Sequence, residues 1–250
     1  MDEFLTFSED RRRVVCEQAQ DKLGLPPATI EKDFWVCWTL KKLFNLPEWG
    51  SKLTFKGGTS LSKGWELIER FSEDIDIVID RDALGFGGDN APDCAPSKKQ
   101  THKRLDGLKT ASQQCVNQTL LPLLSKAVTL DMLPEDLSWQ IDADPDDPDE
   151  QTLLFAYPTA FAEQTAYLPQ SVKIELGARS DTEPTENIEI QPYLTDAFPD
   201  LFPQARFLVR AVSRERTFWK KPCSCMKKPF DRLIKNEKRA WPGTIMTCIA

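Results

Sequence analysis

The stretch KGGTSLSKGWELIERFSEDIDIVID, residues 56–80, holds the patterns from which we predict the fold. Gly57 to Ser60 joins two glycines to two hydroxyl residues, a composition typical of a turn. Ser60 to Arg70 then places apolar residues at helical spacing and predicts one amphipathic helix. From Asp74 to Asp80 polar and apolar residues alternate, which predicts a strand. Because a short apolar run at 53–55 precedes the glycines, we expect the order strand, turn, helix, strand.

Two carboxylates open the second strand of this order. Residues two apart in a strand project to the same side, so Asp74 and Asp76 share one face. Carboxylates that are close together repel each other, and one of them is driven toward protonation unless a cation lies nearby. Mg²⁺ binds carboxylate and phosphate oxygens. We therefore expect Asp74 and Asp76 to be metal ligands; the alternative interpretation is a solvated strand end.

The turn Gly57-Gly58-Thr59-Ser60 is a candidate phosphate-binding site. Glycines allow the backbone to approach a phosphate closely, and N–H groups at the start of the following helix attract anions. The spacing matches neither a Walker loop nor a dinucleotide fingerprint, so a plain turn is the alternative. The acidic strand that follows favours the phosphate interpretation, with a metal beside it.

A second pair of charged residues lies in the predicted strand at 171–178. Alternation places Lys173 and Glu175 on one face of this strand. Glu175 is the candidate third carboxylate of a two-metal site, and Lys173 could neutralise a triphosphate. The alternative is an ion pair, worth less than about 1 kcal/mol if it is exposed.

The rest of the chain predicts helices and strands in mixed order, which indicates an α+β architecture with a small mixed sheet flanked by helices. The expected helices lie at 8–23, 28–44 and 101–127, the last one broken or kinked near Pro122. Further strands are expected at 187–193 and 205–212, and the connection at 179–186 suits a hairpin between 171–178 and 187–193.

Three charged or polar segments have simple structural interpretations. Glu31-Lys32-Asp33 is expected to form the polar side of a helix start. Residues 82–100 are rich in Gly, Pro, Asp and Ser and indicate a surface insertion. The acidic run at 142–150 indicates a solvated turn; calcium binding is the alternative, although the EF-hand spacing is absent.

The composition excludes several classes of protein. The 250 residues contain no run of eighteen apolar residues, and the N-terminus lacks the apolar core of a signal peptide, so we expect a cytoplasmic protein without a membrane span. The seven cysteines form no C-x-x-C pair, and His102 is the only histidine. We therefore expect free thiols rather than a zinc site or disulfides, and no Ser-His-Asp hydrolase.

Four motifs occur in an order that resembles a known family. They are E-K-D-F-W at 31–35, K-G-G-T-S-L-S-K at 56–63, R-F-S-E-D-I-D-I at 70–77 and V-K-I-E-L-G-A-R at 172–179. The resemblance is to the AbiEii/AbiGii toxins, which are nucleotidyltransferase-like toxins of AbiE-type type IV toxin–antitoxin and phage abortive-infection systems. It covers about residues 4–219 and implies the DNA polymerase β-like nucleotidyltransferase fold.

The resemblance also implies roles for residues of this sequence. Gly57, Gly58, Thr59 and Ser60 would form the phosphate-binding turn, with Lys63 supporting the nucleotide from the helix. Asp74 and Asp76 would hold Mg²⁺, Lys173 would face the triphosphate, and the superfamily pattern makes Glu175 the third acidic position.

The implied reaction is transfer of a nucleotidyl group from an NTP. An acceptor hydroxyl, for example of RNA, attacks the α-phosphate and pyrophosphate leaves. A cognate antitoxin encoded nearby is the expected partner. The alternatives are an inactive truncated remnant that at most binds nucleotide, and a metabolite- or antibiotic-modifying nucleotidyltransferase.

Residues 220–250 differ in character from the preceding chain. They carry eight lysines and arginines but only two acidic residues, a net charge of +6, so that the total of −7 leaves −13 for residues 1–219. That excess of acid argues against a broad nucleic-acid-binding face on the main body. We predict a nucleotidyltransferase-like domain at 1–219, with N-terminal helices at 8–45 and a core at 53–212. The family's C-terminal helical part is expected to be missing, and 220–250 to be an aberrant, disordered tail.

A single missing guanine directly after the Trp219 codon would explain this tail. Codons can then be chosen for residues 220–249 whose restored frame matches the continuation of the family. We hypothesise a frameshifted, truncated gene product or a sequencing error of the same kind. Resequencing the locus is expected to return codons compatible with that frame, and incompatible codons would end the hypothesis.

Overall fold

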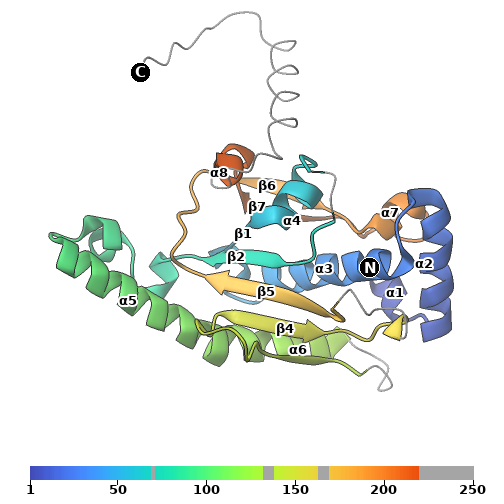
Figure 1. The fold of residues 1–250 in the computed structure, drawn as a ribbon, viewed down its shortest axis with the longest axis horizontal. Helices are drawn as coiled ribbons and strands as arrows, with labels where there is room; N and C mark the ends of the chain where they lie inside the picture. The colour runs from blue at the N-terminus through green and yellow to red at the C-terminus, as the bar shows by residue number, and fades with distance from the viewer. Residues whose placement is uncertain (69–70, 132–137, 163–168, 220–250) are drawn as a thin grey trace, which may run out of the picture.

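A seven-stranded mixed sheet forms the centre of the molecule (Figure 1). The computed structural model describes residues 1–68, 71–131, 138–162 and 169–219. In spatial order the strands are β3 (Gln140–Ala143), β4 (Thr152–Ala156), β5 (Ser171–Gly177), β2 (Ile75–Ile79), β1 (Leu53–Lys56), β7 (Phe207–Val212) and β6 (Thr185–Ile190). The predicted tail at 220–250 lies outside the described residues.

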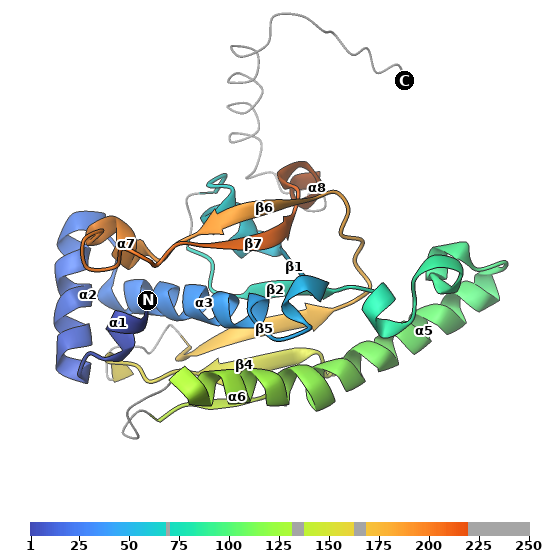
Figure 2. The same ribbon diagram turned by 180° about the vertical axis from the view of Figure 1, so that it is seen from behind.

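The pairing of the central strands confirms the predicted α+β fold with a mixed sheet. β2 lies between an antiparallel neighbour, β1, and a parallel neighbour, β5. β1 also pairs in parallel with β7. The long helices gather on one side of this sheet, which faces the viewer in Figure 2, and the opposite side faces the viewer in Figure 1.

Local signals set the bounds of the N-terminal helices. After a short helix, α1 (Asp2–Leu5), the Ser8 hydroxyl accepts a 3.3 Å hydrogen bond from the Arg11 N–H and begins α2 (Glu9–Leu23). Gly24, at φ +68°, ends α2 in the left-handed conformation that glycine adopts without strain. Pro27 is the first residue of α3 (Pro27–Phe44). The predicted helices at 8–23 and 28–44 are confirmed.

The hydrophobic core lies between α3 and the sheet. Trp35 and Trp38 are fully buried, and their ring centroids lie 5.7 Å apart in an edge-to-face arrangement. Trp38 stacks on Phe155 of β4 at 5.8 Å, and Trp35 stacks on Tyr157 at 5.5 Å. These four rings fasten α3 to the sheet.

The predicted helix at 101–127 is confirmed as a longer, interrupted one. α5 (Lys98–Cys115) begins where the Ser97 hydroxyl accepts the Gln100 N–H at 3.3 Å. A π-helical turn at Val116–Leu120 then leads into α6 (Leu121–Asp131). The irregular turn precedes Pro122, which has no N–H to donate to the turn before it. None of the helices in the described ranges is long and apolar enough to cross a membrane.

Two sequence predictions about the sheet are wrong. The predicted hairpin between 171–178 and 187–193 does not form, because β5 has β4 and β2 as neighbours and β6 pairs with β7 instead. Strands β3 and β4 were not predicted at all. The segment 82–100 contains three short 3₁₀ turns before α5 begins.

The predicted helix from Ser60 to Arg70 is also wrong. The chain forms one short helix, α4 (Gly57–Thr59), and one π-helical turn, Ser60–Gly64. Glu66 then adopts φ +50°, which a continuing helix does not allow. Two short helices complete the described fold, α7 (Tyr193–Ala197) and α8 (Arg214–Trp219).

Trp38→Ala is expected to lower the free energy of unfolding by about 3–5 kcal/mol, because it removes a fully buried ring from the contact between α3 and β4. Urea unfolding measures this loss. Leu208→Ala is the control, since Leu208 is 67 % exposed and its truncation is expected to change stability by less than about 0.5 kcal/mol. Similar losses in both variants would contradict this account of the core.

Candidate active site

Four strands bring polar residues into one row across the sheet. Lys56 of β1 lies opposite Asp76 of β2, Asp76 lies beside Glu175 of β5, and Glu175 lies opposite Thr152 of β4. Residues paired in this way project from the same face. The neighbouring Ile75 points to the other face and is fully buried. The row therefore lies on the side of the sheet that faces away from the core.

Asp74 lies directly before β2, two residues from Asp76. That the two carboxylates share one face stays a prediction. Desolvation raises the pKa of the Asp74 carboxyl, and the negative charges of Glu73 and Glu175 raise it further. The positive charges of Lys173 and Lys32 act in the opposite direction. A cation near Asp74 would offset the negative charges that raise its pKa.

Gly57 brings the glycine turn into contact with Asp76. Its φ of +82° is a conformation that side-chain-bearing residues rarely adopt. A Cβ at this position would lie 1.7 Å from Asp76 Oδ2. Only glycine leaves room for the carboxylate, so the turn and the acidic strand are in direct contact.

The hydroxyls of the glycine turn bind the chain itself. The Thr59 hydroxyl donates to the backbone carbonyl of Asp74 and lies 2.9 Å from the Ser72 hydroxyl. The Ser60 hydroxyl donates to the carbonyl of Gly57 at 2.9 Å. Both side chains are fully buried. Thr59 therefore fastens the turn to the start of β2, and Ser60 stabilises the turn.

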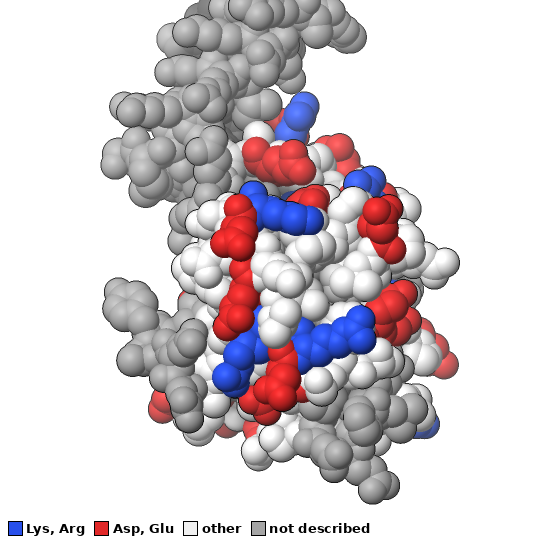
Figure 3. Space-filling view, turned by 90° about the vertical axis from the view of Figure 1, so that its right-hand side faces the viewer, with Lys and Arg blue, Asp and Glu red and all other residues white. Residues whose placement is uncertain are grey.

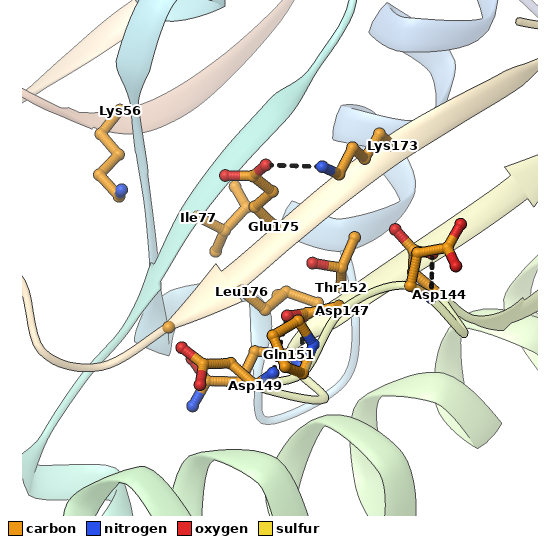
Figure 4. Close-up of a pocket in the computed structure, with 13 residues that line it drawn as sticks. Lys56, Ile77, Asp144, Asp147, Asp149, Gln151, Thr152, Lys173, Glu175 and Leu176 are labelled. Carbon is orange, nitrogen blue, oxygen red and sulfur yellow. Dashed lines mark hydrogen bonds and ion pairs between the residues drawn. The ribbon is translucent and has the colours of Figure 1, made fainter.

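Two lysines accompany the carboxylates of the row. Lys173 Nζ lies 3.1 Å from Glu175 Oε1, and Figure 4 shows this pair beside the cavity. Lys56 Nζ lies 3.7 Å from Asp76 Oδ1. The four residues therefore place two positive and two negative charges side by side. Lys56 is a site residue that the sequence patterns did not indicate, although it directly precedes the glycines.

A cavity of about 460 Å³ opens beside this row (Figure 4). Lys56, Thr152, Lys173 and Glu175 line one part of it, and the acidic turn after β3 lines another. Within that turn the Asp147 carboxylate accepts the N–H groups of residues 149 and 151, each at 2.9 Å. The turn is thus held by its own side chains, and most of its residues are exposed as predicted.

Lys63 lies away from the row. Its ammonium is 2.8 Å from Asp33 Oδ1 and 3.6 Å from the centroid of the Tyr193 ring. The side chain is almost completely buried. Lys63 could therefore affect a bound nucleotide only indirectly, by stabilising the turn to which it belongs.

The donors at this site suit a divalent metal ion in kind. Asp74 and Asp76 supply carboxylate oxygens, the ligands that Mg²⁺ prefers. Glu175 is next to Asp76 in the sheet but is paired with Lys173. In the part of the chain that the structure describes, no three acidic, cysteine or histidine side chains form a group that could hold a metal. The residues present fit an ion held by the two aspartates.

The prediction that Glu31-Lys32-Asp33 forms the polar side of a helix is wrong. All three side chains belong to α3 and are only 1 % exposed. Each has a partner on a different segment, which the sequence pattern could not identify. The available signal was that the three consecutive charges lie between Ile30 and the apolar residues 34–38. A helix segment with so many apolar residues leaves few positions for a solvated face.

The mixed sheet, the glycine turn and the carboxylate row define an α+β protein of the nucleotidyltransferase type. The family model for the nucleotidyl transferase AbiEii toxin of type IV toxin–antitoxin systems matches residues 38–235. The match covers more than half of the chain, which therefore belongs to the AbiEii family.

The match extends past Trp219 into the segment predicted to be aberrant. Membership implies a cognate antitoxin. A comparison with curated proteins found no match.

Gly57→Ala is expected to lower the free energy of unfolding by about 2–5 kcal/mol, because it adds a clash with Asp76 to the backbone strain at positive φ. Gly24→Ala is the matched control: Gly24 also has positive φ, but nothing lies within 4 Å of its added Cβ. Its expected cost is about 1–2 kcal/mol. Equal costs in urea unfolding would show that Asp76 does not restrict residue 57.

Proposed function

We propose that this chain is a Mg²⁺-dependent nucleotidyltransferase-like toxin of an AbiE-type system that transfers a nucleotidyl group from an NTP to an acceptor. The observation that carries the proposal is the contact between Gly57 and Asp76. It joins a glycine turn, of the kind that binds phosphate, to a carboxylate strand, of the kind that binds metal. We further propose that the protein acts in the cytoplasm, with a cognate antitoxin encoded nearby.

The described residues support separate roles in nucleotide binding. Backbone N–H groups of the turn Gly57–Ser60 would contact the phosphates, and Lys63 would support the turn from behind. Asp74 and Asp76 would hold Mg²⁺, which when bound offsets negative charge on the phosphate oxygens. The ammonium groups of Lys56 and Lys173 would contact the triphosphate. The cavity of about 460 Å³ is within the size range of small-molecule sites.

Glu175 would take part in metal binding only after Lys173 has left it for another partner. The Lys173–Glu175 pair is half exposed, at 41 % and 46 %, so it contributes less than about 1 kcal/mol. A triphosphate is a stronger partner for the ammonium than a single carboxylate. Binding of the NTP to Lys173 would therefore leave Glu175 beside Asp76 as the third carboxylate.

The acceptor has two candidates. RNA is the acceptor that we propose first, because it offers hydroxyls for attack on the α-phosphate. The acidic turn at 142–150 borders the cavity, however, and would attract a cationic small molecule, such as an aminoglycoside-like antibiotic. Positive and negative side chains are also interleaved on the side formed by α2 and α7 (Figure 3), rather than gathered into a basic surface. These features favour a metabolite- or antibiotic-modifying enzyme as the second candidate.

Incubation with Mg²⁺ and each labelled NTP, with total RNA or cationic small molecules as acceptors, tests the proposal. Asp76→Ala is expected to lower label transfer at least about 100-fold. Loss of a residue that only hydrogen-bonds to a metal ligand lowers activity by about 10- to 100-fold, and loss of a ligand itself is expected to cost more. Glu189→Ala, which removes an exposed carboxylate from β6, is expected to leave transfer unchanged.

Transfer that survives Asp76→Ala would sink the two-aspartate mechanism. No transfer by this chain, together with transfer by a chain whose frame is restored after Trp219, would identify it as a non-catalytic remnant. Label on small molecules but not on RNA would decide for the second candidate.

A further inference from the structure

Three consecutive charged residues are buried in the first half of α3. Glu31, Lys32 and Asp33 are each 1 % exposed. Removing a charge from water is costly unless an opposite charge or hydrogen bonds compensate for it. Successive residues of a helix point about 100° apart, so the three side chains reach three different parts of the chain.

Asp33 holds the segment that follows the glycine turn. Its two carboxylate oxygens lie 2.8 Å and 3.1 Å from Lys63 Nζ, and one of them accepts the Tyr193 N–H at 2.7 Å. The Tyr193 ring covers the same ammonium at 3.6 Å. Lys63 belongs to the π-helical turn Ser60–Gly64, which continues directly from the glycine turn. Asp33 therefore fixes the glycine turn through the segment that follows it.

Lys32 holds the carboxylate strands. Its ammonium donates to the Glu73 carboxylate and, at 2.9 Å, to the carbonyl of Pro169. Glu73 lies two residues before β2, and Pro169 lies two residues before β5. One buried ammonium thus fixes the beginnings of the two neighbouring strands that carry Asp76 and Glu175.

We propose that Lys32 and Asp33 are positioning residues that hold the carboxylate strands and the glycine turn at a fixed separation. The two residues are adjacent in one rigid helix, so the distance between their partners is set by the helix itself. This inference rests on the proposed function, because it assigns the separation a role in binding a metal-bound triphosphate.

Glu31 offers a matched comparison within the same helical turn. It is buried to the same extent, but its carboxylate accepts hydrogen bonds from the Thr159 hydroxyl at 2.6 Å and the Ala160 N–H at 2.9 Å. Neither of these residues is part of the row or the turn. A purely structural role for the buried charges predicts similar effects at all three positions, whereas positioning predicts effects on the site only at Lys32 and Asp33.

The test uses the full chain and replaces each ion pair as a unit. The Asp33–Lys63 pair is buried on both sides, and replacing such a pair by apolar residues of similar size often leaves stability unchanged, which separates positioning from folding. Glu73 is 34 % exposed, so its uncharged replacement is glutamine. The variants are Asp33→Leu with Lys63→Met, Lys32→Met with Glu73→Gln, and Glu31→Gln as the control. Asp33→Asn with Lys63→Gln is the substitute if the first double variant does not fold, since it also removes both charges of the pair.

Each variant is first shown to be folded by an unfolding measurement, and two further measurements are then made. Hydrogen–deuterium exchange of the apo protein reports on residues 56–64 and 71–77, and calorimetry reports the Kd for Mg²⁺ with each NTP. The Asp33 variants are expected to speed exchange in 56–64, and the Lys32 variant in 71–77. Each is expected to weaken binding of the Mg²⁺-bound NTP by about 10- to 100-fold. Glu31→Gln is expected to lower the Tm without changing either measurement at the site.

The outcomes separate this inference from the proposed function. Folded double variants with wild-type exchange and wild-type Kd would overturn the inference. Glu31→Gln would overturn it as well if this variant weakens nucleotide binding as much as the double variants do. A wild-type chain that binds no Mg²⁺-bound NTP would defeat the proposed function, while the exchange data would still decide whether Lys32 and Asp33 fix the turn and the strands.

Discussion

The close approach of the Asp76 carboxylate to the Cα of Gly57 is the constraint on which the candidate site depends. The carboxylate occupies the space of a Cβ, so the turn can reach the strand only through a glycine at positive φ. The antiparallel pairing that brings them together also sets Lys56 opposite Asp76, and the parallel pairing of β2 with β5 adds Glu175. The contact between Gly57 and Asp76 therefore aligns the glycine turn, two lysines and the carboxylates.

The buried charges of α3 extend this alignment into the core. Apolar packing through Trp35 and Trp38 fixes where α3 lies on the sheet, but it tolerates small shifts because dispersion is not directional. Hydrogen-bonded ion pairs are directional, so Lys32 and Asp33 restrict their partners more narrowly than the ring contacts can. The hydrophobic core thus supports the sheet, and the charges determine how its site-bearing segments meet.

The sequence patterns predicted what local physics decides. Ser8 and Gly24 bound α2 as expected because capping depends on neighbouring residues only, and the alternation from Asp74 onward identified β2 and its two faces. Pairing is not local: nothing near β5 indicates that both of its edges are covered by β4 and β2, so the hairpin prediction was wrong. The helix predicted over 60–70 is wrong because the apolar residues keep helical spacing past Glu66, whereas the backbone leaves the helical conformation at that residue. The buried triplet was missed because its partners come from distant segments.

The lysines near the site divide into two kinds, and burial separates them. Lys32 and Lys63 are almost fully enclosed and engaged by the chain, and exchanging the partner of Lys63 for a ligand would leave the buried Asp33 carboxylate uncompensated. Lys56 and Lys173 lie at the cavity in partly exposed pairs, which contribute little stability and can be replaced at little cost. The same residue type therefore serves two purposes. The enclosed lysines hold the geometry, and the partly exposed lysines leave positive charge at the cavity, where the proposed triphosphate would lie.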